Sequence, residues 1–564
     1  MNKQQFRILY REFLFRIVDL EVLAPQGEVS KLLGQFAALL IFVSLWLSAV
    51  ALMMSAGRKN PGSGLLMAWV AGHFLIATTM LAVGLFAVMS WDSTFPDRRD
   101  VLVLFPLPIR ARTLLLAKIA AVATALGITV LSLNVFTGVV APVASASAVG
   151  VVPFARSFAA YWIATFAAGV FIFCGVLTVQ GLAQLLPRRT FLRVSAFLQM
   201  GFFVLLLTIY FLQPPFSDAA DLLKNQRLLY WTPSYWYLGL LQQLAGPTLP
   251  GAGLLARRAL LGSAITACGA AASYLLCYWR TLRQIAEQPD ILPDRSGLRW
   301  LPRFGDSFQT AVGQFSIRTL LRSRQHRVIL SFYLGIALGL AMFFSSGPAL
   351  QQFALESSAW HRPNTSLMVA SIIVLCFAVV GIRIVFSVPL ELRANWIFRI
   401  ASDAGAGACV AASRRSLYTL ALLPVWLGAA GLFFRLWPWR IAAEHLAILG
   451  ALGLAVAELS LCGFHKIPFT CAYLPGKLQF NMAVVYLLLF LISITWGAEL
   501  EMRALDDPAL YAGVLLALIA AATAAYLRTT AQAGAGQAAV RFDETPEPAL
   551  SPLDLHRDGV TPLR

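Results

Sequence analysis

Residues 66–90 read LMAWVAGHFLIATTMLAVGLFAVMS and carry a single ionisable side chain, His73. A helix of about 20 apolar residues is long enough to cross the ~30 Å hydrocarbon core of a bilayer. A second apolar run follows at 117–140, and similar runs recur along the rest of the chain. The pattern therefore predicts an all-α polytopic membrane protein.

The composition agrees with this class. Only 13% of the 564 residues are charged, whereas a soluble domain has about 25%. The net charge of +17 is attributed to Lys and Arg gathered in cytoplasmic loops, so no nucleic-acid partner is expected. The seven cysteines form no C-x-x-C pair, which argues against a disulfide framework or a zinc site.

Twelve apolar runs meet the length requirement for a span, in two sets of six. They are 34–56, 66–90, 117–140, 158–186, 191–213, 259–279, 328–347, 366–388, 417–436, 441–464, 480–498 and 509–527. With the N-terminus inside, Lys and Arg favour the inside segments by about three to one. Both termini are therefore expected in the cytoplasm, in a multi-pass protein of the cell (inner or plasma) membrane.

The order of these runs divides the chain into five segments. They are a cytoplasmic amphipathic interfacial helix in 1–33, a six-span half in 34–280, a basic cytoplasmic connector in 281–327, a second six-span half in 328–527 and a cytoplasmic tail in 528–564. Basic amphipathic stretches at 5–20 and 308–327 precede the two halves. We interpret this as an architectural repeat, which in transporters places the pathway between the halves.

A long charged loop joins the two runs described first. It reads FPDRRDVLVLFPLPIRAR (95–112) and places its mixed charges before two helix-breaking prolines. Its notable residues are Asp97, Arg98, Arg99, Asp100, Pro106, Pro108, Arg110 and Arg112. A helix then restarts and enters the membrane, with Lys118 extending toward the inner interface. We expect this loop to dock into a groove of a soluble partner, and PLELRANWIFRI (389–400), with Glu391 and Arg393, to be its counterpart.

The loop resembles that of the type-2 ABC exporter permeases. Those subunits carry an acidic residue, a leucine-rich step, a Leu-Pro pair and a Lys-bearing span. The matching pieces here are Asp97 to Asp100, LVLFPLP (102–108) and LLLAK (114–118). The stretch 5–20 resembles the connecting helix of that family, and TPSYWYLGLL (232–241) resembles its Pro-aromatic segment.

The resemblance covers about the first 280 residues. It implies a permease of an ATP-driven exporter, whose cytoplasmic loops contact a separate dimeric ABC ATPase, with membrane lipid around it and a lipid-like or amphipathic cargo. Members usually have six spans and pair two chains, so twelve spans imply that one chain carries both halves. The 230–241 aromatics are interpreted either as an interfacial belt or as a short re-entrant or interfacial helix.

The chain lacks the motifs of an enzyme that acts alone. No G-x-x-x-x-G-K-[ST] sequence is present, and LPGKLQ (474–479) lacks the upstream glycine and the hydroxyl residue. The six histidines form no ligand cluster, so neither a metal nor a cofactor is expected. We therefore expect a subunit without catalytic residues that depends on a separate ATPase.

Two ionisable residues within the spans are pathway candidates, Glu458 and His73. The alternative for each is a hydrogen-bonded packing role or a water-facing position near a span end. Gln180, Gln184 and Asn134 are interpreted as helix–helix hydrogen-bonding residues.

Two other functions compete with the permease hypothesis. An ion-coupled secondary transporter would use Glu458 and His73 as its coupling pair. A membrane enzyme acting on lipid-linked substrates would need acidic or histidine residues clustered at a membrane face. The acidic residues Asp97, Asp100 and Glu391 lie among arginines, which disfavours such a site.

Overall fold

A computed structural model of the chain describes residues 3–18, 29–56, 61–95, 107, 109–145, 150–211, 230–246, 251–287, 306–345, 362–390, 406–464, 467–470 and 480–534. Of this described part, 91% is helical and none is β-strand. It contains nine helices long and apolar enough to cross a membrane. The prediction of an all-α, multi-pass membrane protein is thus confirmed at this level.

All twelve predicted spans fall on helices. The nine membrane-length apolar segments among the described residues are Trp69–Met89, Arg112–Asn134, Val151–Gln184, Ala252–Cys277, Gln325–Ser345, Thr365–Val385, Gly407–Leu436, Trp439–Leu461 and Pro508–Gln532. The other three predicted spans coincide with α2 (Val29–Ala56), α8 (Arg188–Phe211) and α21 (Phe480–Asp506). The number of twelve spans and the cytoplasmic location of the termini stay predictions.

The chain forms two compact units. Unit 1 comprises Met1–Leu298 and Ser331–Val374, and unit 2 comprises Arg299–Leu330 and Leu375–Arg564. Helices α14 (Arg324–Ser345) and α16 (Thr365–Val385) therefore contribute residues to both units. The two units are defined by which residues contact one another. The predicted six-span halves are defined by the order of the spans along the chain, and their boundaries stay predictions.

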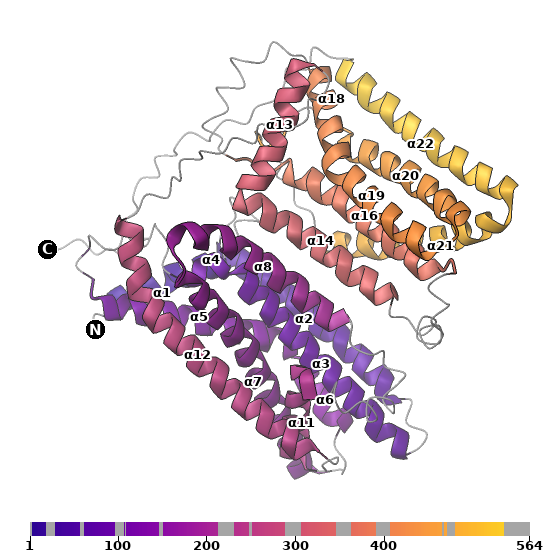
Figure 1. The fold of residues 1–564 in the computed structure, drawn as a ribbon. Helices are drawn as coiled ribbons and strands as arrows, with labels where there is room; N and C mark the ends of the chain where they lie inside the picture. The colour runs from indigo at the N-terminus through magenta and orange to yellow at the C-terminus, as the bar shows by residue number, and fades with distance from the viewer. Residues whose placement is uncertain are drawn as a thin grey trace. The chain divides into compact units, whose positions relative to one another are not determined.

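Unit 1 is a helical bundle in which α7 is central (Figure 1). Its other elements are α1 (Lys3–Val18), α2, α3 (Pro61–Met89), α4 (Trp91–Thr94), α5 (Ala111–Asn134), α6 (Thr137–Ser145), α8, α11 (Pro233–Ala245) and α12 (Ala252–Glu287). Helix α7 (Val151–Gln184) packs against α3, α5, α6, α8, α11 and α12. Its buried face includes Ala160, Ala164 and Ala168, small residues that let neighbouring backbones approach closely.

Helix α1 is covered by protein along its apolar face. Leu9, Phe13 and Ile17 are buried and belong to one hydrophobic cluster with Ala117 and Ala121 of α5. The opposite face is exposed, as amphipathic periodicity predicts. The apolar stripe of α1 therefore packs against small residues of α5.

The Pro-aromatic segment forms helix α11, which begins at Pro233 in the first turn, where a missing N–H costs nothing. Tyr235, Tyr237 and Leu238 are buried against α3, α7 and α12, whereas Trp231 is exposed. Protein thus covers one face of this helix, which is what a re-entrant backbone requires.

Unit 2 is a second bundle, built mainly from the C-terminal third of the chain. Its elements besides α21 are α13 (Ser307–Arg322), α18 (Ala406–Leu417), the π-helix η4 (Tyr418–Leu422), α19 (Leu423–Leu436), α20 (Trp439–Leu461) and α22 (Pro508–Gly534). Helix α20 lies beside α19 and α22 (Figure 1).

Two helix pairings recur in the two units. The amphipathic helix α1 packs against α5, the third predicted span, and the amphipathic helix α13 packs against α18, at the start of the ninth. The fourth and sixth spans of each set also pair extensively, as α7 with α12 and as α20 with α22. Equivalent elements therefore have equivalent neighbours although the two halves share little sequence.

The contact between α11 and α12 depends on a glycine. A Cβ added at Gly239 would meet the Cβ of Leu255 and would lie 3.0 Å from the carbonyl oxygen of Ala252. Neither atom belongs to a flexible side-chain end, so Gly239→Ala has to push the helices apart. We expect it to destabilise the chain by about 1–3 kcal/mol, as overpacking does.

The measurement is the thermal unfolding midpoint of the purified chain in detergent. Gly127→Ala in α5 is the matched control, because a Cβ there meets nothing within 4 Å. A Gly239→Ala midpoint equal to that of the control would contradict the packing of α11 on α12.

Candidate functional site

The predicted ATPase-coupling residues are only partly described by the structure. Arg110 and Arg112 are exposed at the start of α5. The others lie outside the described residues: Asp97, Arg98, Arg99, Asp100, Pro106, Pro108, Glu391 and Arg393. Their role stays a prediction, and the described residues nearest to them are those of the helices from which the two loops emerge.

Three carbonyl groups at the base of the first loop accept hydrogen bonds from three different spans. Gln199 Nε2 of α8 donates to the carbonyl of Val88 over 2.9 Å. Gln180 Nε2 of α7 donates to the carbonyl of Trp91. Lys118 Nζ of α5 donates to the carbonyl of Phe95 over 2.7 Å.

The same segment is held by its side chains. Trp91 and Phe95 are buried, and Trp91 Nε1 donates to Ser195 Oγ of α8 over 3.0 Å. The carbonyls at the end of a helix have no intrahelical partner and carry partial negative charge, so donors and a cation are favourable there. We call the residues Lys118, Gln180, Ser195 and Gln199 the loop clamp.

Lys118 is buried at 2% exposure, and its ammonium lies 5.3 Å from the ring centroid of Phe13 in α1. Lys118 thereby contacts α1 and the loop base from its place on α5. Its predicted position near the inner membrane interface stays a prediction.

The second predicted loop also starts from a fixed base. Phe469 N donates to the carbonyl of Phe386 over 2.8 Å, and Leu390 N donates to the carbonyl of Phe469 over 3.0 Å. His326 Nε2 lies 3.0 Å from the carbonyl oxygen of Val388. Both loops thus leave the bundle from segments whose backbone groups are bonded to other elements.

Glu458 lies in a buried polar cluster of unit 2. One carboxylate oxygen accepts from Arg414 Nε over 2.6 Å and from the Tyr418 hydroxyl. The other accepts from Arg414 Nη2 and from the Thr529 hydroxyl, each over 3.0 Å. A carboxylate has about four lone-pair sites, so this one has no acceptor site left for a transported ion.

The cluster lies near the end of a span. Glu458 is in the last turn of α20, which ends at Leu461, whereas the sequence places it well inside an apolar run. The arginine comes from α18, which the sequence assigns to a cytoplasmic loop and counts as a topological charge. Its guanidinium also stacks over the ring of Tyr526 at 4.3 Å.

A helical irregularity places Tyr418 in this cluster. Tyr418 is the first residue of the π-helix η4, where Leu423 N donates to the Tyr418 carbonyl. Pro424 follows at the start of α19 and lacks the N–H that an α-helix would use. Such π-turns often occur at functional sites.

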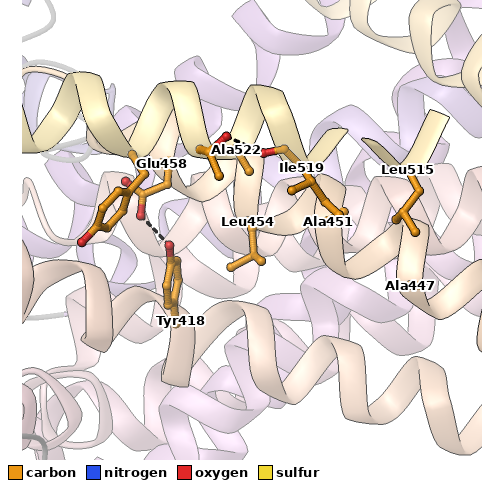
Figure 2. A pocket seen from close by; sticks show the side chains of 10 residues that line it. Tyr418, Ala447, Ala451, Leu454, Glu458, Leu515, Ile519 and Ala522 are labelled. Carbon is orange, nitrogen blue, oxygen red and sulfur yellow. Dashed lines mark hydrogen bonds between the residues drawn. The ribbon is translucent and has the colours of Figure 1, made fainter. Parts of the chain in front are cut away.

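A groove runs from this cluster between α20 and α22, with a volume of about 460 Å³. Figure 2 shows Glu458 and Tyr418 at one end and Ala447 and Leu515 at the other. The walls between are small or aliphatic, including Leu454, which is partly exposed. The groove can accommodate a hydrocarbon chain, whereas its polar end is already saturated with hydrogen bonds.

His73, the other pathway candidate, belongs to unit 1. Its Nε2 lies 2.8 Å from Ser234 Oγ, and its ring stacks on Tyr235 at 3.8 Å. Burial raises the pKa of the Tyr235 phenol, so a neutral ring faces the imidazole. His73 and Glu458 therefore each have partners within their own unit, and those partners fit the packing alternative for both residues.

Two of the three amide side chains predicted to bond across helices, Asn134 and Gln180, do so. Asn134 Oδ1 accepts from the Tyr161 hydroxyl over 2.7 Å, and Asn134 Nδ2 donates to Thr79 Oγ1. Within the part of the chain that the structure describes, no group of three His, Cys, Asp or Glu side chains is arranged to hold a metal ion.

The sequence interpretation missed Arg414, Tyr418 and Thr529 as partners of Glu458. One signal was available, because Arg414 and Tyr418 are four residues apart and share a helical face. No sequence pattern indicated that Thr529 would bind Glu458, because Thr529 lies 71 positions away on another helix.

Removing one member of the buried Arg414–Glu458 pair should lower the free energy of unfolding far more than removing one member of a solvent-exposed pair. Glu458→Met leaves Arg414 buried without a carboxylate. We expect the free energy of unfolding to fall by about 3–5 kcal/mol. The double variant Arg414→Met/Glu458→Met should recover most of this loss. Glu444→Met is the control, since its pair with Arg440 is solvent-exposed and worth at most about 1 kcal/mol.

Thermal midpoints of the four proteins in detergent provide the measurement. Equal shifts for Glu458→Met and Glu444→Met would contradict the buried pair.

No protein-family model, no curated protein and no solved structure matches this chain. The functional assignment therefore depends on the sequence and on the geometry of the described residues.

Proposed function

We propose that this chain is the membrane-spanning permease subunit of an ATP-driven, ABC-type exporter of the cell membrane. The observation that carries the proposal is the loop clamp. It ties the base of the 96–110 segment to α5, α7 and α8 through the carbonyls of Val88, Trp91 and Phe95. A partner that displaces this segment would move three spans together.

The energy source is a separate polypeptide in this proposal. The chain has no P-loop for nucleotide phosphates, so a dimeric ATPase binds the cytoplasmic loops. The 97–112 loop is the first contact and 391–399 is the second. Coupling follows from differential contacts that the ATPase makes with two states of the membrane subunit.

The recurrence of helix pairings supports two six-span halves in one chain. In this arrangement the twelve predicted spans place both termini in the cytoplasm, where the ATPase binds. The pairings of α1 with α5 and of α13 with α18 give each half an amphipathic helix beside the span that follows its coupling loop.

The saturated hydrogen bonding of Glu458 favours this function over an ion-coupled transporter that uses Glu458 and His73. A coupling carboxylate has to exchange partners during the cycle. Glu458 would first have to release a bidentate arginine, which is among the stronger polar contacts in proteins.

The first test is affinity purification of the tagged chain in mild detergent, with partners identified by mass spectrometry. We expect a stoichiometric P-loop ATPase with the wild-type chain and its loss from Arg98→Glu/Arg99→Glu. Arg257→Glu/Arg258→Glu is the matched control, because it makes the same charge change at an exposed pair predicted to lie on the outer side. Absence of an ATPase from the wild-type sample would overturn the proposal.

The second test separates docking from coupling. Lys118→Met leaves the Phe95 carbonyl without its ammonium donor and removes the cation beside Phe13, while the loop residues are unchanged. We expect the ATPase to co-purify in wild-type amounts. In the wild-type complex, nucleotide should change the rate of tryptic cleavage after the exposed Arg110 and Arg112. In the Lys118→Met complex this response should be lost; a response equal to that of the wild type would exclude Lys118 from coupling.

A further inference from the structure

The groove between α20 and α22 has the length of one leaflet of a bilayer. Its lining residues run from Ala447 to Glu458 on α20 and from Leu515 to Tyr526 on α22 (Figure 2). Each range covers eleven helical steps, which is about 16 Å at a rise of about 1.5 Å per residue. Half of the ~30 Å hydrocarbon core of a bilayer is about 15 Å. An acyl chain from one leaflet therefore matches the groove in length.

The groove is open to the surface that meets lipid. Its walls include Leu454, Ile519 and Ala522, and the first two of these side chains are exposed. Both helices are apolar segments of membrane length, and only 11% of the apolar segment of α22 is buried within the protein. The volume of about 460 Å³ lies within the range of about 300–1,000 Å³ that is typical of small-ligand sites. Lipid tails are as apolar as these walls, so hydrocarbon fits the groove.

The end of the groove at Glu458 is amphipathic. Tyr526 lines this end, and its ring lies under the guanidinium of Arg414 at 4.3 Å. The Tyr526 hydroxyl has no hydrogen-bond partner in the part of the chain that the structure describes. Tyrosine is enriched where hydrocarbon meets lipid headgroups. A hydroxyl that can donate to a lipid oxygen therefore stands at the mouth of an apolar groove.

The helices around this end carry a net positive charge. The charged side chains here on α18, α20 and α22 are Arg414, Arg415, Glu458 and Arg528. Arg414 neutralises Glu458. Arg415 and Arg528 are exposed, and neither has an ion-pair partner among the described residues. Unpaired cations at the membrane surface attract anionic headgroups.

We propose that the groove between α20 and α22 binds one acyl chain of an anionic phospholipid, with its phosphate at the Tyr526 end beside Arg415 and Arg528. In the predicted topology this end is cytoplasmic, and the cytoplasmic leaflet is the one that carries anionic lipids. The proposal is independent of the exporter function, because none of these residues belongs to the predicted ATPase contacts.

The test is native mass spectrometry of the purified chain in mild detergent, titrated with phosphatidylglycerol or with phosphatidylcholine of the same acyl chains. We expect one phospholipid to bind the wild-type chain more tightly than all others, with phosphatidylglycerol preferred. Ala522→Trp fills the groove and should abolish this tight binding for both lipids. Ala520→Trp is the matched control, because Ala520 is exposed on the same helix and does not line the groove.

A second comparison tests the headgroup contact. Arg415→Gln/Arg528→Gln should lower the preference for phosphatidylglycerol over phosphatidylcholine by about fivefold for each cation removed. The affinity for phosphatidylcholine should stay at the wild-type value. Arg435→Gln/Arg503→Gln is the control, because it makes the same charge change at exposed positions near the other ends of the helices.

A wild-type chain without a tightly bound phospholipid would overturn the proposal. Equal binding by Ala522→Trp and Ala520→Trp would also overturn it, and Leu454→Trp, at an exposed wall position, repeats this comparison if Ala522→Trp does not fold. A preference that is unchanged in Arg415→Gln/Arg528→Gln would overturn the placement of the phosphate. Loss of tight binding in the groove-filling variants alone, with a lowered preference in the arginine variant alone, would establish the site.

Discussion

Hydrocarbon offers no hydrogen bonds, so each freed carbonyl and each buried charge of this chain has to be matched from within the protein. The end of α3 shows how this constraint shapes the bundle. The carbonyls of Val88 in α3, Trp91 in α4 and Phe95 at the end of α4 accept hydrogen bonds from side chains of α8, α7 and α5. The base of the loop that follows is therefore anchored to three spans.

In unit 2 a buried charge is matched by partners from within the protein. Glu458 is satisfied by four hydrogen bonds from α18, η4 and α22, so the ends of three predicted spans are held at one point. The π-turn at Tyr418 is part of this solution, because it brings the hydroxyl to the carboxylate. The pair of His445 and Glu501 is less complete, since one carboxylate oxygen and the nearby Trp437 N–H remain unpaired among the described residues.

The two units also share a pattern of packing that sequence comparison of the halves does not reveal. In each, an amphipathic helix lies against the span that follows the charged loop, and the fourth and sixth predicted spans pair. Interior positions in these helices are occupied by many different apolar side chains, and packing tolerates such exchanges if volume is kept. Architecture can therefore repeat where residue identity does not.

The sequence alone determined the class of the protein and the position of its helices. Runs of apolar residues specify membrane helices because length and hydropathy are local properties, and every predicted span falls on a helix. Some side-chain roles were also accessible, such as the cross-helix bonding of Asn134.

The partners of the buried charges were decided only by the tertiary structure. Arg414 looks like a loop residue in the sequence, and it meets a glutamate 44 positions away. Lys118 is predicted to extend toward the inner interface, and the structure adds its partner, the carbonyl of Phe95, 23 positions away. His445 finds Glu501 56 positions away. Pairing depends on which helices are neighbours and how they are rotated, and neither property is encoded in the hydropathy of a single segment.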